Sequence, residues 1–189
     1  MNRALLSSVK MDYSTPDDFY DWADRCLRFT IDLAASKQNA KHPRFFSLAA
    51  NALAQSWEGE TGWLNPPYGR GIGSWLEKAR DSATWERAIV ACLVPARVDT
   101  SWWRNFVMQR DGKSGRLRES VYAPSSGVHW YRWEGLTAGV YFHDERLPFD
   151  DLDGAPFPSA LVVLASPKRK RPMPAYRPGD VKLLEGWTW

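Results

Sequence analysis

Two consecutive prolines, Pro66 and Pro67, constrain this chain more than any other feature of its sequence. Each proline fixes its own φ and lacks an N–H donor, so neither a helix nor a central strand can run through them. Each also holds the residue before it in an extended conformation. The apolar pair Trp63-Leu64 precedes them and reads as the end of a buried strand. The sequence therefore predicts a strand that ends in a stiff connector, with Asn65 at one end and Tyr68 at the other.

The side chains at the two ends of this connector suit a flat, amine-bearing ligand. The amide of Asn65 can accept a hydrogen bond from an amino group and donate one elsewhere, and Tyr68 offers an aromatic face for stacking. Asn-Pro is also a general turn signal, so the tetrapeptide could be no more than a turn. Its place after an apolar strand and before glycines at 69, 71 and 73 favours a binding site, because open α/β sheets bind ligands at the carboxyl ends of strands.

Two further segments predict strands with polar residues at their carboxyl ends. Residues 29–33 form a short apolar run that contains Asp32, and the small residues 34–36 follow it. A carboxylate at such a point needs a donor or a ligand, so Asp32 is either a capping residue or faces a polar cofactor. Residues 88–94 show little alternation, as expected of a parallel strand covered on both faces, and Arg97 follows them.

Helical patterns separate these strands. Capping residues and apolar spacing predict helices that start near Thr15, Ser47 and Asp99-Thr100, and a further helix around Trp75–Ala79. Strand, helix, strand, helix in this order indicates a parallel α/β sheet. Residues 140–142 and 160–164 predict closing strands that run antiparallel.

The composition changes near residue 109. Between residues 110 and 133, basic residues alternate with glycines and aromatic rings. Such a segment suits a nucleic-acid surface, where cations meet phosphates and rings meet bases. An insertion with its own small hydrophobic cluster is the alternative.

Length and composition set broad limits. The 189 residues fit one domain, and 25 basic against 22 acidic residues leave any nucleic-acid surface to a local patch. Cys26 and Cys92 lie in apolar segments, which predicts buried free thiols and a cytoplasmic protein. We expect no metal site, because the histidines and cysteines lack ligand spacing. We also expect no membrane span and no signal peptide.

Taken together, these pieces resemble the phage-type DNA N6-adenine methyltransferases, over roughly residues 14–165. The resemblance is carried by the following segments: Thr15-Pro16, 29–36 with 39–41, 65–70, 93–97 with Asp99, Thr100 and Trp102, 146–149 and 155–159. It implies a single Rossmann-like α/β domain with a mostly parallel sheet, helices on both faces and an antiparallel closing strand. It also implies an adenine-specific DNA methyltransferase that uses S-adenosylmethionine and is encoded by a phage or prophage in a bacterial host.

The resemblance further implies roles for individual residues. The Asn65 side-chain oxygen and the Pro66 carbonyl would accept from the adenine amine, and Tyr68 would stack on the flipped base, with Pro67 completing the catalytic tetrad. The cofactor would be bound by Thr15, Asp32, Ala34 and Asn51. Apart from the resemblance, the basic residues near the connector and in the segment at 110–133 are candidates to contact double-stranded DNA: Arg70, Arg97, Arg116, Arg118 and Arg132.

Two departures and several alternatives accompany this resemblance. The glycine-rich turn common in the cofactor fold is Ala34-Ala35-Ser36 here, and the tetrad begins with Asn where many adenine-modifying enzymes have Asp. The same tetrad occurs in enzymes that methylate RNA bases or protein glutamines. A nucleic-acid binding module without turnover is a further alternative.

The expected organisation has three parts. Residues 1–13 form a flexible lead-in, 14–166 the methyltransferase domain, and 167–189 a basic, proline-containing tail. Residues 109–139 are a possible DNA-contacting insertion within the domain. A monomer is favoured.

Overall fold

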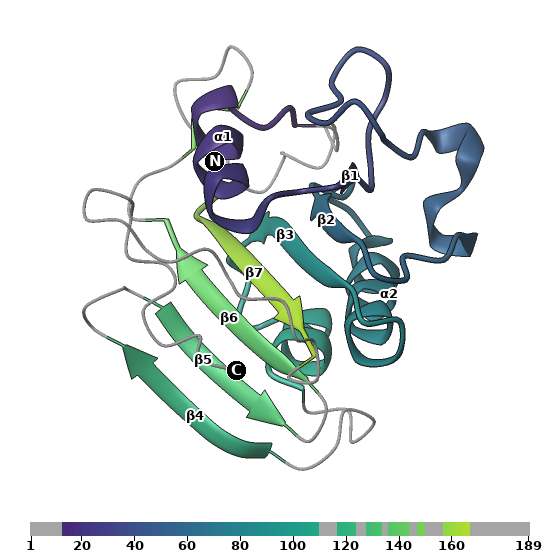
Figure 1. Ribbon diagram of the computed structural model, residues 1–189. Helices are drawn as coiled ribbons and strands as arrows, with labels where there is room; N and C mark the ends of the chain where they lie inside the picture. Colours follow the sequence, from purple (N-terminus) through teal and green to yellow (C-terminus); the bar gives the residue numbers. More distant parts are fainter. Residues whose placement is uncertain are drawn as a thin grey trace.

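A single mixed sheet forms the centre of the molecule (Figure 1). The computed structural model describes residues 13–109, 117–123, 128–133, 136–143, 147–149 and 157–166, and for 117–123, 128–133 and Thr137 it describes the backbone. Its elements are α1 (Asp17–Leu27), β1 (Ile31–Asp32), η2 (Leu48–Ala50), η3 (Ala52–Ala54), β2 (Thr61–Leu64), α2 (Ile72–Trp85), β3 (Ile89–Pro95), η4 (Trp103–Val107), β4 (Leu117–Ala123), β5 (Val128–Trp133), β6 (Thr137–Phe142) and β7 (Ser159–Ala165).

The strands follow the order β1-β2-β3-β7-β6-β5-β4. β1, β2 and β3 pair in parallel, whereas β7, β6, β5 and β4 continue the sheet in antiparallel pairs. The α/β class and the antiparallel closing strands are thus confirmed, but the prediction of a mostly parallel sheet is wrong. The connections from β4 to β5 and from β5 to β6 are too short for the crossover that a parallel pair requires.

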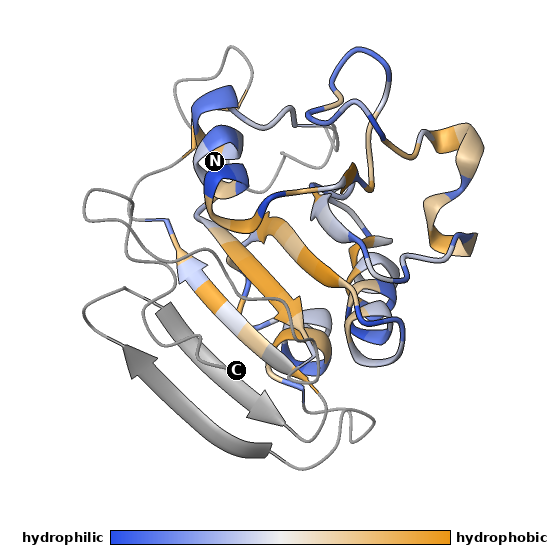
Figure 2. Cartoon of the chain, viewed as in Figure 1, coloured by the Kyte–Doolittle hydropathy of each residue, from blue (hydrophilic) through white to orange (hydrophobic). Residues whose placement is uncertain are grey.

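Helices cover both faces of the sheet, as predicted. Val90, Cys92 and Val94 of β3 pack with α2 and η4 in one hydrophobic core, while Ala91 and Leu93 pack with α1 in a second. This alternation explains why β3 is apolar throughout, since neither of its faces meets water. Figure 2 shows β3 and β7 as predominantly hydrophobic ribbons at the centre of the chain.

α1 buries the apolar stripe that the sequence predicts. Phe19, Ala23, Cys26 and Leu27 lie in the core against the sheet, and Asp17 and Asp18 occupy the first helical turn, where acidic residues complement the helix dipole. The free thiols of Cys26 and Cys92 are both buried, as predicted. Thr15 does not cap the helix, because the N-cap position is Pro16 and no side chain bonds there.

The prediction of a helix that starts near Ser47 is wrong. Two short 3-10 turns, η2 and η3, occupy this segment, and Asn51 between them has a left-handed backbone with φ of 48°. A helix needs an apolar face to bury, and Leu48 is instead 96% exposed. Asn tolerates the left-handed conformation better than most residues, so the chain turns here at the outer edge of the molecule (Figure 1).

Several sequence features lie outside the described residues. They are residues 1–12 of the lead-in, parts of the possible insertion at 109–139, and the tail at 167–189. In the part of the chain that is described, no helix is long and apolar enough to cross a membrane.

The close approach of β1 and β2 depends on Gly62. A Cβ atom at this position would lie 2.8 Å from Leu33 Cγ and would meet a second atom of the same side chain. Leu33 is fully buried, so it has little room to move away. We expect Gly62→Ala to lower the free energy of unfolding by about 1–3 kcal/mol, the range typical of overpacked cores.

Chemical denaturation of Gly62→Ala and Gly71→Ala tests this expectation. Gly71 is the matched control, because a Cβ there meets nothing within 4 Å and its φ of −82° suits any residue. Equal stability of the two variants would show that Leu33 can repack freely.

Candidate active site

The carboxyl ends of β1 and β2 bring two of the predicted residues to one edge of the sheet. Asp32 is the last residue of β1 and pairs with Trp63 of β2. Asn65 is the first residue after β2, which ends at Leu64. Because the two strands are parallel, the residues that leave them emerge side by side.

The connector after β2 has the form predicted from its prolines. Pro66 is buried, Pro67 is exposed and Tyr68 is half-buried. The chain then turns, with the Ile72 amide donating to the Gly69 carbonyl at 3.2 Å, and α2 begins. Strand, rigid connector and helix therefore follow one another without a long loop.

The side chain of Asn65 is held by the segment that precedes α1. Its Nδ2 donates to the Tyr13 carbonyl oxygen at 2.5 Å and to Thr15 Oγ1 at 3.1 Å. No described residue donates a hydrogen bond to Asn65 Oδ1 or to the Pro66 carbonyl oxygen. Two adjacent acceptors are thus available at the end of β2.

Tyr68 belongs to an aromatic cluster formed with Tyr13, Phe149 and Phe157. Its ring stacks on Tyr13 with centroids 5.6 Å apart and an interplanar angle of 29°, and it meets Phe157 edge-on at 5.4 Å and Phe149 at 6.3 Å. Its hydroxyl donates to the Leu93 carbonyl at 3.3 Å, and burial raises the pKa of that hydroxyl. Tyr68 is therefore a neutral ring fixed in place by its neighbours.

Sequence reasoning did not place the three partner rings in the site. Tyr13 falls in the expected lead-in, yet it is only 6% exposed. Phe149 and Phe157 lie in segments that contributed to the resemblance, but no role was inferred for them. Their only sequence signal is the repeated aromatic-proline pattern at 148–149 and 156–158, which does not reveal a contact with Tyr68.

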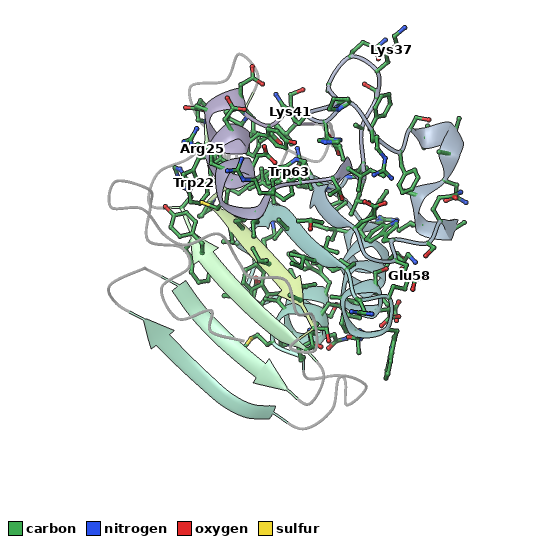
Figure 3. All side chains as sticks on the ribbon, viewed as in Figure 1. Trp22, Arg25, Lys37, Lys41, Glu58 and Trp63 are labelled. Carbon is green, nitrogen blue, oxygen red and sulfur yellow. The ribbon has the colours of Figure 1, made fainter. Side chains whose placement is uncertain are left out.

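Asp32 organises the loop that follows β1. Its Oδ1 accepts from the Ala34 amide at 3.2 Å and its Oδ2 from the Lys41 amide at 3.0 Å. The side chain of Lys41 reaches Asp17 at the start of α1, and Figure 3 shows Lys41 facing the helix while Lys37 points outward from the loop. The two carboxylate oxygens therefore hold both ends of the turn over residues 34–41.

The pKa of the Asp32 carboxyl is raised, because the group is only 3% exposed and burial disfavours its charge. The two backbone hydrogen bonds and the nearby charges of His42 and Lys41 act in the opposite direction. A buried carboxylate has room for about four hydrogen bonds in all. Asp32 thus serves as a structural cap and retains the capacity to accept from a ligand.

The remaining predicted residues are more dispersed. Ala34 is half-buried in the loop after β1, and Asn51 is exposed on the turn between η2 and η3, with no hydrogen bond from its side chain to the rest of the described chain. The role of Asn51 in binding the cofactor stays a prediction.

The arginines predicted to contact DNA fall into two groups. Arg70 and Arg97 are exposed, and the Arg97 guanidinium lies 6.0 Å from the ring of Phe157, at the margin of the aromatic cluster. Arg118 lies on β4 and Arg132 on β5, two strands of which the backbone is described. Arg116 lies outside the described residues. Over the described ranges, no three His, Cys, Asp or Glu residues come together as a metal site.

One family profile and two phage proteins with the same description match this chain. A family profile described as DNA N-6-adenine-methyltransferase (Dam) matches residues 3–112. A DNA N-6-adenine-methyltransferase of Haemophilus phage HP1 is 26% identical over 120 residues, which are 61% of this chain and 64% of that protein. One of Escherichia phage T1 is 31% identical over 98 residues, 51% of this chain and 40% of that protein. The chain thus matches less than two thirds of the length of either relative.

The raised pKa of Asp32 gives a pH dependence with a definite sign. A folded-state pKa above the ordinary value of about 3.9 means that the folded chain binds more protons than the unfolded chain between the two values. Stability contributed by this group is then present at low pH and is lost as pH rises through the folded pKa. We expect the free energy of unfolding of the wild type, relative to that of Asp32→Asn, to fall from acid to neutral pH, because only the wild-type side chain becomes charged.

Urea denaturation of both proteins at a series of pH values measures this difference. A wild-type advantage that grows with pH would contradict the expectation. It would show that the Ala34 and Lys41 amides outweigh burial and lower the pKa of the carboxyl.

Proposed function

The chain belongs to the DNA N-6-adenine-methyltransferase (Dam) family, and on that premise we propose that it transfers a methyl group from S-adenosylmethionine to the N6 amine of a flipped adenine in DNA. The observation that carries the proposal is the pair of acceptors at the end of β2. Asn65 Oδ1 and the Pro66 carbonyl receive no hydrogen bond from the described residues. An exocyclic amine presents two N–H donors, one for each acceptor.

Holding the amine by two acceptors would direct its reactivity. When both N–H bonds point at carbonyl oxygens, the nitrogen lone pair turns away from them and toward an electrophile. The nitrogen must lose one proton for each methyl group that it gains. Neither carbonyl oxygen is basic enough to keep that proton, so in our proposal it passes to solvent.

Flipping the base out of the duplex costs about a few kcal/mol, and stacking can return roughly 1–3 kcal/mol per base. In our proposal Tyr68 supplies this contact. One side of the ring is already stacked on Tyr13, so we propose that the adenine uses the part of Tyr68 that remains exposed. The surrounding rings of Phe149 and Phe157 would keep Tyr68 from moving when the base enters.

The loop after β1 fits a cofactor with hydroxyl and ammonium donors. Asp32 retains acceptor capacity beyond its two backbone hydrogen bonds, and the small side chain of Ala34 leaves the backbone approachable. In a Rossmann-like arrangement, a ligand at the carboxyl ends of β1 and β2 would lie beside Asn65. S-adenosylmethionine supplies an electrophilic methyl group when bound there.

The DNA substrate would meet the basic residues near the site. Arg97 lies at the margin of the aromatic cluster, and Arg70 follows the connector directly. Arg118 and Arg132 belong to strands beyond the region that the family profile matches, which ends at residue 112. We propose that they extend the DNA surface along β4 and β5. Both relatives are phage proteins, and we propose a phage or prophage origin for this chain as well.

We expect Asn65→Ala to lower methyl transfer to DNA by about 100-fold or more, by analogy with the loss of one transition-state hydrogen bond in a preorganised site. Cofactor affinity should stay within a few-fold, because Asn65 contacts the amine. Asp32→Ala should instead weaken cofactor binding. Turnover is measured as N6-methyladenine in DNA, and cofactor binding by calorimetry.

Two outcomes would contradict the proposed enzyme. Normal turnover by Asn65→Ala would remove that residue from the reaction. DNA affinity without cofactor binding in the wild-type protein would indicate a nucleic-acid binding module.

Replacing Arg116, Arg118 and Arg132 with Gln should lower DNA affinity and flatten its dependence on salt. The slope of log K against log salt should fall by about 1 for each phosphate contact removed. Binding is measured by fluorescence anisotropy at several salt concentrations.

The matched control replaces three other arginines, Arg25, Arg28 and Arg87, which are exposed. Arg28 and Arg87 precede β1 and β3, and therefore lie at the opposite edge of the parallel strands. If the control changes the salt slope as much as the first triple variant, the DNA surface does not lie on β4 and β5.

A further inference from the structure

We infer that Thr15 is a positioning residue, which fixes the side-chain amide of Asn65 so that its oxygen faces the substrate. This inference rests on the proposed function of Asn65 and adds a role that the sequence does not suggest, since Thr15 was expected to contact the cofactor. It is carried by the two hydrogen bonds that Asn65 Nδ2 donates, to the Tyr13 carbonyl and to Thr15 Oγ1.

The identity of the acceptors determines which way the amide points. A backbone carbonyl can only accept a hydrogen bond, so the Tyr13 carbonyl must face the Asn65 nitrogen. In the reversed orientation the Asn65 and Tyr13 oxygens would face each other, and the hydrogen bond between Asn65 Nδ2 and the Tyr13 carbonyl would be lost. An amide nitrogen carries two hydrogens, and the Thr15 hydroxyl accepts the second.

The Tyr13–Thr15 segment is itself fixed, which is necessary if it is to hold Asn65. The ring of Tyr13 stacks on Tyr68, and both Tyr13 and Thr15 are buried, at 6% and 4% exposed. The first helical hydrogen bond, from the Tyr20 amide to the Pro16 carbonyl at 3.1 Å, anchors the segment to α1. The amide is thus held from a rigid support.

Orientation matters because the two ends of the amide have opposite chemistry. Oδ1 accepts from an N–H group, whereas Nδ2 would repel the same group by offering it another donor. With both Nδ2 hydrogens bonded, Oδ1 is the only end left for the substrate amine. Without Thr15 one of these two bonds is lost, and the amide can rotate away from its productive orientation.

Thr15→Val removes the hydroxyl while keeping the branched shape of the side chain, and Thr15→Ser keeps the hydroxyl. We expect Thr15→Val to lower kcat about 10-fold, the effect of losing one hydrogen bond, with the cofactor dissociation constant within twofold of wild type. Thr15→Ser should retain wild-type kcat. In an Asn65→Ala background the same Thr15→Val change should have no further effect, because the group that it positions is gone.

A rise in the cofactor dissociation constant with unchanged kcat would overturn the inference and return Thr15 to the cofactor pocket. Equal losses from Thr15→Val in the presence and absence of Asn65 would also overturn it, since they would indicate a structural effect.

A second measurement does not depend on activity. The two side-chain amide protons of Asn65 can be observed by ¹⁵N-resolved NMR and assigned by their loss in Asn65→Ala. In Thr15→Val we expect one of the two resonances to shift and its exchange with water to accelerate, while Thr15→Ser resembles wild type. Unchanged amide resonances in Thr15→Val would overturn the inference.

The two readouts distinguish this inference from the proposed function. If the wild-type protein methylates no DNA, the proposed function fails, and the NMR result alone decides whether Thr15 fixes the amide. If the wild type is active and the resonances do not respond to Thr15→Val, only the role of Thr15 is wrong. A thermal melt of each variant shows whether it is folded under the conditions used.

Discussion

The side-chain amide of Asn65 joins two segments that lie far apart in the sequence, the end of β2 and the residues before α1. The rest of the site depends on this link. Because the nitrogen is bonded to the Tyr13 carbonyl and the Thr15 hydroxyl, the oxygen is the end left for a ligand. The prolines that follow keep the connector extended, so the neighbouring carbonyl of Pro66 is presented beside it.

Asp32 is costly to bury, but it holds the loop that follows β1. A carboxylate that is almost fully buried loses hydration, and two backbone amides from Ala34 and Lys41 offset only part of that loss. An apolar residue at this position would avoid the cost but could not hold the loop that follows β1. Groups with a strongly shifted pKa cluster at functional sites, and the sequence already indicated this carboxylate because its position requires a donor or a ligand.

The first half of the chain was predictable because its signals are local. The prolines after β2, the uniformly apolar β3 and the amphipathic α1 each produce the structure that their residues favour. The segment from Ser47 to Trp57 was not, because its alanines favour a helix while Leu48 has no core to enter. Strands β4 and β5 also escaped prediction, since residues 109–139 were interpreted as a possible DNA-contacting insertion. Contacts such as Tyr13 with Tyr68 have no local signal at all.

The antiparallel half of the sheet contributes to the site through its geometry. β7 pairs with β3 along seven residues, and this register places Ser159 opposite Pro95, at the carboxyl end of β3. Phe157, two residues before Ser159, therefore reaches the edge where Asn65 and Tyr68 emerge, and its ring packs edge-on against Tyr68. An antiparallel strand begins where its neighbour ends, so a ring late in the sequence can support a connector that is formed early. A parallel strand in the place of β7 would begin at the opposite edge and could not deliver Phe157 to Tyr68.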